Sequence, residues 1–81
     1  MERNELSKEI VDFFTQYGFF YVSEKSKNTR VNAIVQQLDE SWFLEHLIQT
    51  LMLEAKYKEN MDYKRLNQLI SELEKIRLEL E

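Results

Sequence analysis

The chain lacks cysteine and proline, and its 81 residues include one glycine and one histidine. Without cysteine it can form neither a disulfide framework nor a thiolate metal site, which is unlike small secreted scaffolds and predicts a cytoplasmic protein. A single glycine cannot build the glycine-rich phosphate loops of the common nucleotide-binding motifs. Because residues for tight turns are so scarce, the sequence favours helices joined by short polar loops.

Long apolar runs are also missing. The first ten residues lack the apolar core of a secretory signal, and no run approaches the roughly 18 to 20 apolar residues that span a bilayer. We therefore expect no membrane partner. Hydrophobic residues make up 43% of the chain and charged residues 32%, which is typical of a folded domain. A chain this short buries too little surface for two separate cores, so we expect a single helical domain over residues 1–81.

Apolar residues recur at helical spacing in four stretches, which predicts an all-α fold, a small bundle of three to four helices. The expected helices cover residues 5–17, 29–38, 41–57 and 62–80. Residues 12–25 hold six of the ten aromatic residues around Gly18, and we interpret this cluster mainly as a core plug. An aromatic connector then follows the first helix. A hairpin of residues 19–23 with 30–35 is the alternative.

Several residues are suited to begin or end these helices. Asn4 is the expected N-cap of the first helix, and Gly18 would close it in the left-handed conformation. Residues 24–28 read as a polar loop. Asp39 or Ser41 is expected to cap the third helix, and Asp62 the last.

The last two helices carry the most apolar surface. The third is apolar on most sides, which is typical of a central helix. In the fourth, apolar residues are spaced by 3, 4, 3 and 4, as in a coiled-coil seam, and Leu78 lies outside that seam. This surplus favours a homodimer packed through the two helices. The expected interface residues are Trp42, Phe43, Leu66, Leu69, Ile70, Leu73, Ile76 and Leu80.

Catalytic and metal sites find little support in the sequence. His46 falls on one line of the third helix with Trp42, Thr50 and Leu53, but no second histidine or cysteine could complete a metal site. Nothing arranges a nucleophile beside it. We therefore interpret His46 as structural and expect no enzyme activity and no cofactor.

Nucleic-acid binding is the first alternative. It would use two basic loops, yet the chain has a net charge of −4, and residues 39–55 contain no Lys or Arg. A negative chain lacks the counterion release that supplies most nucleic-acid affinity. The possible contact residues are Lys25, Lys27, Arg30, Lys56, Lys58, Lys64 and Arg65.

A carrier protein is the more distant alternative. The chain resembles acyl carrier proteins in length and acidity, but those carriers present Asp-Ser-Leu, whereas this chain reads Asp39-Glu40-Ser41-Trp42. The resemblance would imply attachment of phosphopantetheine to Ser41. The main hypothesis remains a small non-enzymatic regulator, inhibitor or adaptor that binds another protein through apolar helical surfaces, as a homodimer.

Overall fold

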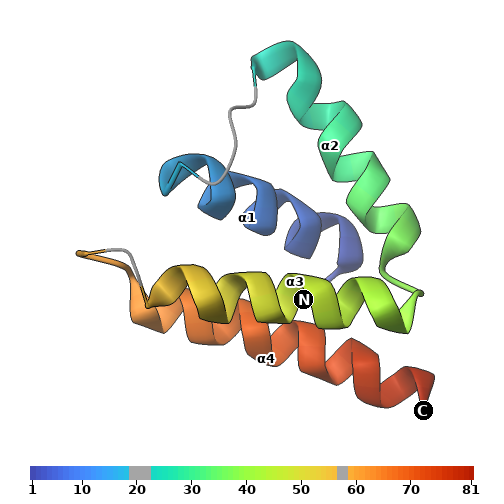
Figure 1. The fold of residues 1–81 in the computed structure, drawn as a ribbon. Helices are drawn as coiled ribbons and strands as arrows, with labels where there is room; N and C mark the ends of the chain where they lie inside the picture. Colours follow the sequence, from blue (N-terminus) through green and yellow to red (C-terminus); the bar gives the residue numbers. More distant parts are fainter. Residues whose placement is uncertain (19–22, 57–58) are drawn as a thin grey trace. The chain divides into compact units, whose positions relative to one another are not determined.

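The computed structural model describes residues 1–18, 23–56 and 59–81. These residues form four α-helices and no strand (Figure 1). The helices are α1 (Arg3–Gln16), α2 (Glu24–Gln37), α3 (Ser41–Ala55) and α4 (Tyr63–Leu80). The prediction of a small all-α fold is confirmed, while the aromatic connector at residues 19–22 lies outside the described residues. The chain divides into two compact units, Met1–Gln37 and Leu38–Glu81.

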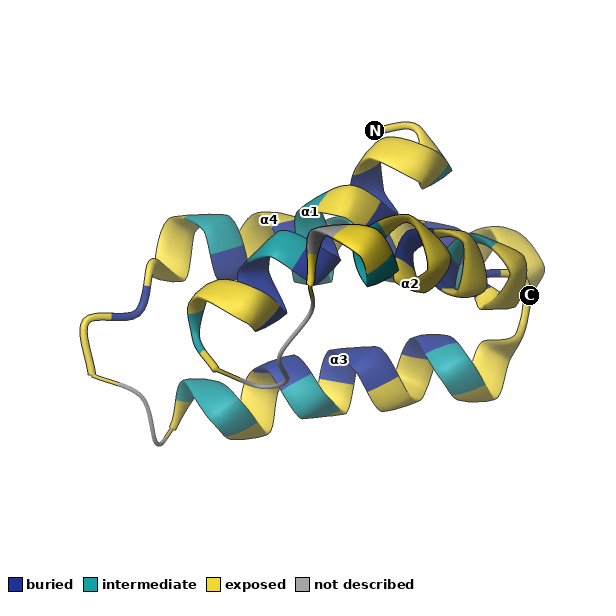
Figure 2. Cartoon of the chain, turned by 90° about the horizontal axis from the view of Figure 1, so that it is seen from above, coloured by how far each residue is buried: buried dark blue, intermediate teal, exposed yellow. Residues whose placement is uncertain are grey.

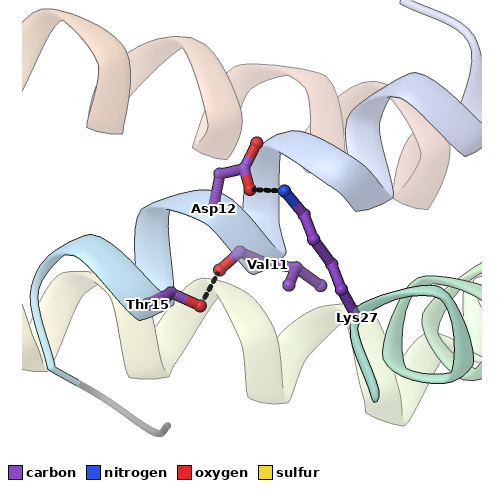
Figure 3. A network of polar contacts seen from close by, with 4 residues as sticks. All are labelled: Val11, Asp12, Thr15 and Lys27. Carbon is purple, nitrogen blue, oxygen red and sulfur yellow. Dashed lines mark hydrogen bonds and ion pairs between the residues drawn. The ribbon is translucent and has the colours of Figure 1, made fainter. Parts of the chain in front are cut away.

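In the first unit, α1 packs against α2. The predicted apolar stripe of α1 is largely buried, with Tyr17 half-buried and its ring 4.7 Å from that of Phe13 between centroids. An ion pair between Asp12 on α1 and Lys27 on α2 links the two helices (Figure 3). The buried apolar residues are Leu6, Ile10, Val11, Phe13 and Phe14 on α1 and Val31 and Ile34 on α2.

The ends of α1 only partly match the prediction. The expected N-cap at Asn4 is wrong: the amide of Leu6 donates to the carbonyl of Glu2 at 2.8 Å, so the helix begins earlier and Asn4 lies inside it. The expected stop at Gly18 is confirmed. Its φ is +75°, a left-handed value that glycine adopts without steric cost. Beside it, the Thr15 hydroxyl donates to the Val11 carbonyl at 2.8 Å (Figure 3).

Helix α2 begins at Glu24, so the prediction of a polar loop at residues 24–28 is wrong. Ser23 explains the difference. Its side-chain oxygen accepts a hydrogen bond from the amide of Ser26 at 3.2 Å, which is the pattern of an N-cap. The helix therefore starts directly after this serine. Residues 30–35 lie within α2, so the alternative hairpin is also wrong.

In the second unit, α3 and α4 pack side by side and run in opposite directions (Figure 1). Two contacts mark the two ends of this pair. The Tyr63 hydroxyl donates to the Ala55 carbonyl at 3.3 Å, and Arg77 lies 3.7 Å from the Glu45 carboxylate. The buried residues are Leu44, Leu47, Ile48 and Leu51 on α3 and Leu66, Leu69, Leu73 and Ile76 on α4.

The two helices of this unit start differently. Asp62 caps α4 as predicted, its carboxylate accepting from the Arg65 amide at 3.1 Å. For α3 the expected caps are wrong: Glu40 occupies the N-cap position without a side-chain bond, and Ser41 is the first helical residue. Asn60, between the helices, has a φ of +58°, in the left-handed region that asparagine tolerates better than most residues.

Candidate protein-binding surface on helix α3

Helix α3 is buried on one side and exposed on the other (Figure 2). Three large apolar side chains lie on the exposed side: Trp42 is 61% exposed, Met52 55% and Leu53 53%. The surplus of apolar residues expected on α3 is therefore exposed in the structure. A water-exposed indole and two exposed aliphatic chains on one helix form a candidate interaction surface, and α4 of the same unit also exposes Tyr63, Leu78 and Leu80.

Five exposed residues follow one another along this side at intervals of 4, 3, 4 and 3 residues. This is the interval pattern of a coiled-coil seam, and it keeps all five side chains on one face of the helix. We call this face the outer seam of α3. It consists of Trp42, His46, Gln49, Leu53 and Lys56.

A hollow of about 320 Å³ opens at the C-terminal half of the outer seam. Among the described residues it is lined by Gln49, Met52, Leu53 and Lys56. Relative to Leu53, the other three lie four residues before, one before and three after it. Four residues at these positions surround the hole that receives a partner side chain in knobs-into-holes packing.

The charges beside the outer seam are divided between its two ends. The start of α3 is acidic, with Asp39, Glu40 and Glu45, whereas its C-terminal end carries one acid, Glu54, and one base, Lys56. The Glu45 carboxylate has a cation nearby in Arg77 of the same unit, at 3.7 Å. The middle of the seam carries the polar side chains of His46 and Gln49, so the surface has an acidic start and an end where Glu54 and Lys56 balance.

The eight expected interface residues differ in how far they are buried. Four of the eight, Leu66, Leu69, Leu73 and Ile76, are buried within the chain and contribute to its core. Phe43 and Ile70 are half-buried, while Trp42 and Leu80 are exposed. Leu78 is also exposed, as its position outside the seam of α4 predicts.

Sequence reasoning missed Met52, Leu53 and Gln49 as surface residues. A usable signal was present, because Leu53 follows Trp42 by eleven residues and Gln49 and His46 fill the positions between them. That spacing is the one that marked the seam of α4. The line through Trp42, His46 and Leu53 follows from the spacing alone, but spacing does not show that this line is exposed.

The possible nucleic-acid contacts fall into separate parts of the chain. Lys25, Lys27 and Arg30 lie in helix α2 of the first unit rather than in a loop, and Lys27 pairs with Asp12. In the second unit, Lys56 is the C-cap of α3, and Lys64 and Arg65 occupy the first turn of α4. Lys58 lies outside the described residues.

The other candidate residues also lie at the surface. His46 is exposed on the outer seam, and Ser41 is exposed at the start of α3. Over the part of the chain that the structure describes, no three His, Asp or Glu side chains gather to hold a metal ion. Within residues 1–18, 23–56 and 59–81, no helix combines the length and apolar content needed to cross a membrane.

No protein-family model, curated protein or solved structure matches this chain.

Proposed function

We propose that this protein is a small non-enzymatic regulator or adaptor that binds another protein through apolar helical surfaces, and that it forms a homodimer through the outer seam of α3. Its cysteine-free composition suits a reducing compartment, and we propose the cytoplasm. Regulation, inhibition and assembly all require the same physical property, which is a surface whose removal from water lowers the free energy.

The exposure of Trp42, Met52 and Leu53 on one helix carries this proposal. Removing apolar surface from water contributes about 25 cal/mol per Å². Aromatic residues are enriched among the few side chains that dominate binding energy in protein interfaces. A partner that covers this helix face would therefore gain most at Trp42, and the polar residues around it would form the rim.

Sedimentation velocity at micromolar concentration tests the proposal. We expect the parent chain to sediment at twice its 9.9 kDa mass. Leu53→Ser should shift it to a monomer, because the substitution places a hydroxyl in the proposed contact. Leu78→Ser is the matched control: Leu78 is 64% exposed, similar to Leu53, but lies on α4.

The control should remain dimeric. A parent chain that sediments as a monomer throughout this range would contradict the homodimer. A dimer that survives Leu53→Ser and dissociates with Leu78→Ser would show that α3 is not the binding surface.

A further inference from the structure

We infer that the hollow on α3 receives Trp42 of a second copy, so that two α3 helices pair antiparallel about a two-fold axis. This inference rests on the proposed function and specifies the partner and geometry of the same surface. The hollow and the exposed indole belong to one helix face, and they supply the two halves of a knobs-into-holes contact.

Trp42 cannot fill the hollow of its own chain. Leu53, which lines the hollow, follows Trp42 by eleven residues of a continuous helix. At 1.5 Å per residue the two positions are about 16 Å apart along the axis. A side chain on a helix cannot reach that far along its own face, so only another molecule can bring an equivalent indole into the hollow.

A two-fold axis across the outer seam, between His46 and Gln49, makes both contacts at once. It places Trp42 of each copy against Leu53 of the other, and His46 of each copy against Gln49 of the other. Both hollows are then filled and neither knob is left over, so the contact closes as a dimer. A head-to-tail contact would leave one knob and one hollow open, and would continue into a chain of molecules.

The division of charge favours the antiparallel direction. In this register Lys56 of one copy lies near the turn that precedes α3 of the other and carries Asp39 and Glu40, and the acidic starts of the two helices lie at opposite ends of the contact. A parallel pair would instead bring Asp39, Glu40 and Glu45 of both copies together. Opposed like charges are costly in an interface, whereas complementary ends fix direction and register.

Polar residues at the centre of the seam further define the register. His46 and Gln49 would lie nearest the two-fold axis, and a polar residue at a seam position selects one alignment at some cost in stability. Gln49 also lines the hollow, where its amide oxygen is an acceptor suited to the indole N–H of the incoming Trp42. A shift in register would move the Gln49 amide of one copy away from the Trp42 indole of the other.

Single-cysteine crosslinking of the full chain tests the geometry, since the parent chain contains no cysteine. Asp39→Cys and Lys56→Cys are prepared separately, mixed, allowed to exchange and treated with a short bis-maleimide. We expect covalent dimers in the mixture. Each variant alone should stay uncrosslinked, because its two cysteines would lie about 25 Å apart along the antiparallel pair. Asp39→Cys mixed with Leu78→Cys is the control and should not crosslink.

Three results would overturn the inference. Crosslinking of Asp39→Cys alone and Lys56→Cys alone, with sedimentation still showing dimers, would indicate a parallel pair and leave the proposed function intact. Dimers by sedimentation that crosslink in no combination would place the contact elsewhere. Monomers by sedimentation would overturn both the inference and the homodimer.

Discussion

Helices α3 and α4 pack against each other, yet their exposed sides differ. Within its 15 residues α3 has two charged side chains, Glu45 and Glu54, whereas the 18 residues of α4 include seven. Helix α4 carries ion pairs from Lys75 to Glu72 and from Arg77 to Glu74, at 3.4 and 3.2 Å. Both helices expose large apolar side chains, namely Trp42, Met52 and Leu53 on α3 and Tyr63, Leu78 and Leu80 on α4, but those of α3 are accompanied by fewer charged residues.

This difference separates two roles within one helical pair. Helix α4 has the pattern of a helix that is buried on one stripe and solvated on the other, with short ion pairs between neighbouring turns. Helix α3 has a buried stripe and a second seam on its opposite side. Because this second seam is exposed in the single chain, it is the feature on which the proposed contact with a second copy rests.

The largest effect should come from the buried stripe of α4. Leu73 is fully buried, and Leu73→Ala should lower the free energy of unfolding by about 2 to 5 kcal/mol, because it removes apolar contacts and leaves a cavity. Leu78→Ala, on the exposed side, should change it by less than about 0.5 kcal/mol. Urea unfolding measures both. An unfolding midpoint unaffected by Leu73→Ala would mean that α4 is not part of the folded core.

The next effect concerns the outer seam of α3. Trp42→Ala should weaken dimerisation by at least about 30-fold, the equivalent of 2 kcal/mol for a dominant interface residue. The variant should keep its helical circular dichroism, since Trp42 is mostly exposed in the single chain. Sedimentation equilibrium gives the dissociation constant. An unchanged dissociation constant would mean that Trp42 does not contribute to the dimer and that the exposed side of α3 is simply solvated, like that of α4.

A smaller effect distinguishes the starts of the two helices. Asp62→Ala should cost about 1 kcal/mol of unfolding free energy, because Asp62 accepts from the Arg65 amide. Ser41→Ala should be nearly neutral, since Ser41 lies inside α3 and does not cap it. Thermal unfolding of both variants provides the comparison. Equal losses would show that α3 depends on a serine cap after all.

The smallest effect is expected on the charged side of α4. Lys75→Ala removes an exposed ion pair with Glu72 and should change the unfolding free energy by less than about 0.5 kcal/mol. The difference should shrink further in high salt, which screens exposed charges. A loss above 1 kcal/mol in urea unfolding would mean that the solvated face of α4 contributes to folding more than its exposure indicates.

Much of the fold could be predicted from the spacing of apolar residues. The stripes of α1 and α4 follow one helical period, and the caps at Gly18 and Asp62 follow from residue chemistry. The start of α2 was missed because Ser23 and the residues after it look like a loop, whereas one local hydrogen bond makes Ser23 a cap. The predicted N-cap at Asn4 was wrong for the opposite reason: Asn4 is a suitable capping residue, but it lies just inside the helix and not at its start.

The candidate site was harder to predict than the fold. The regular spacing of Leu66, Leu69 and Leu73 identified a seam, but spacing alone cannot tell whether a seam is buried within a chain or between chains. The outer seam of α3 alternates apolar and polar side chains, so counting apolar residues does not reveal it. Its identification needed the exposed fractions of Trp42 and Leu53, which only the packed structure supplies.

The fluorescence of Trp42 tests the central claim most directly, because Trp42 is the only tryptophan in the chain. On dilution from high to low micromolar concentration, we predict that the emission maximum moves to longer wavelength as the indole leaves the second copy and enters water, in step with the loss of dimer by sedimentation. Leu53→Ser should show the long-wavelength emission at every concentration. An emission maximum that stays constant while the dimer dissociates would contradict the claim that the outer seam of α3 is the contact surface.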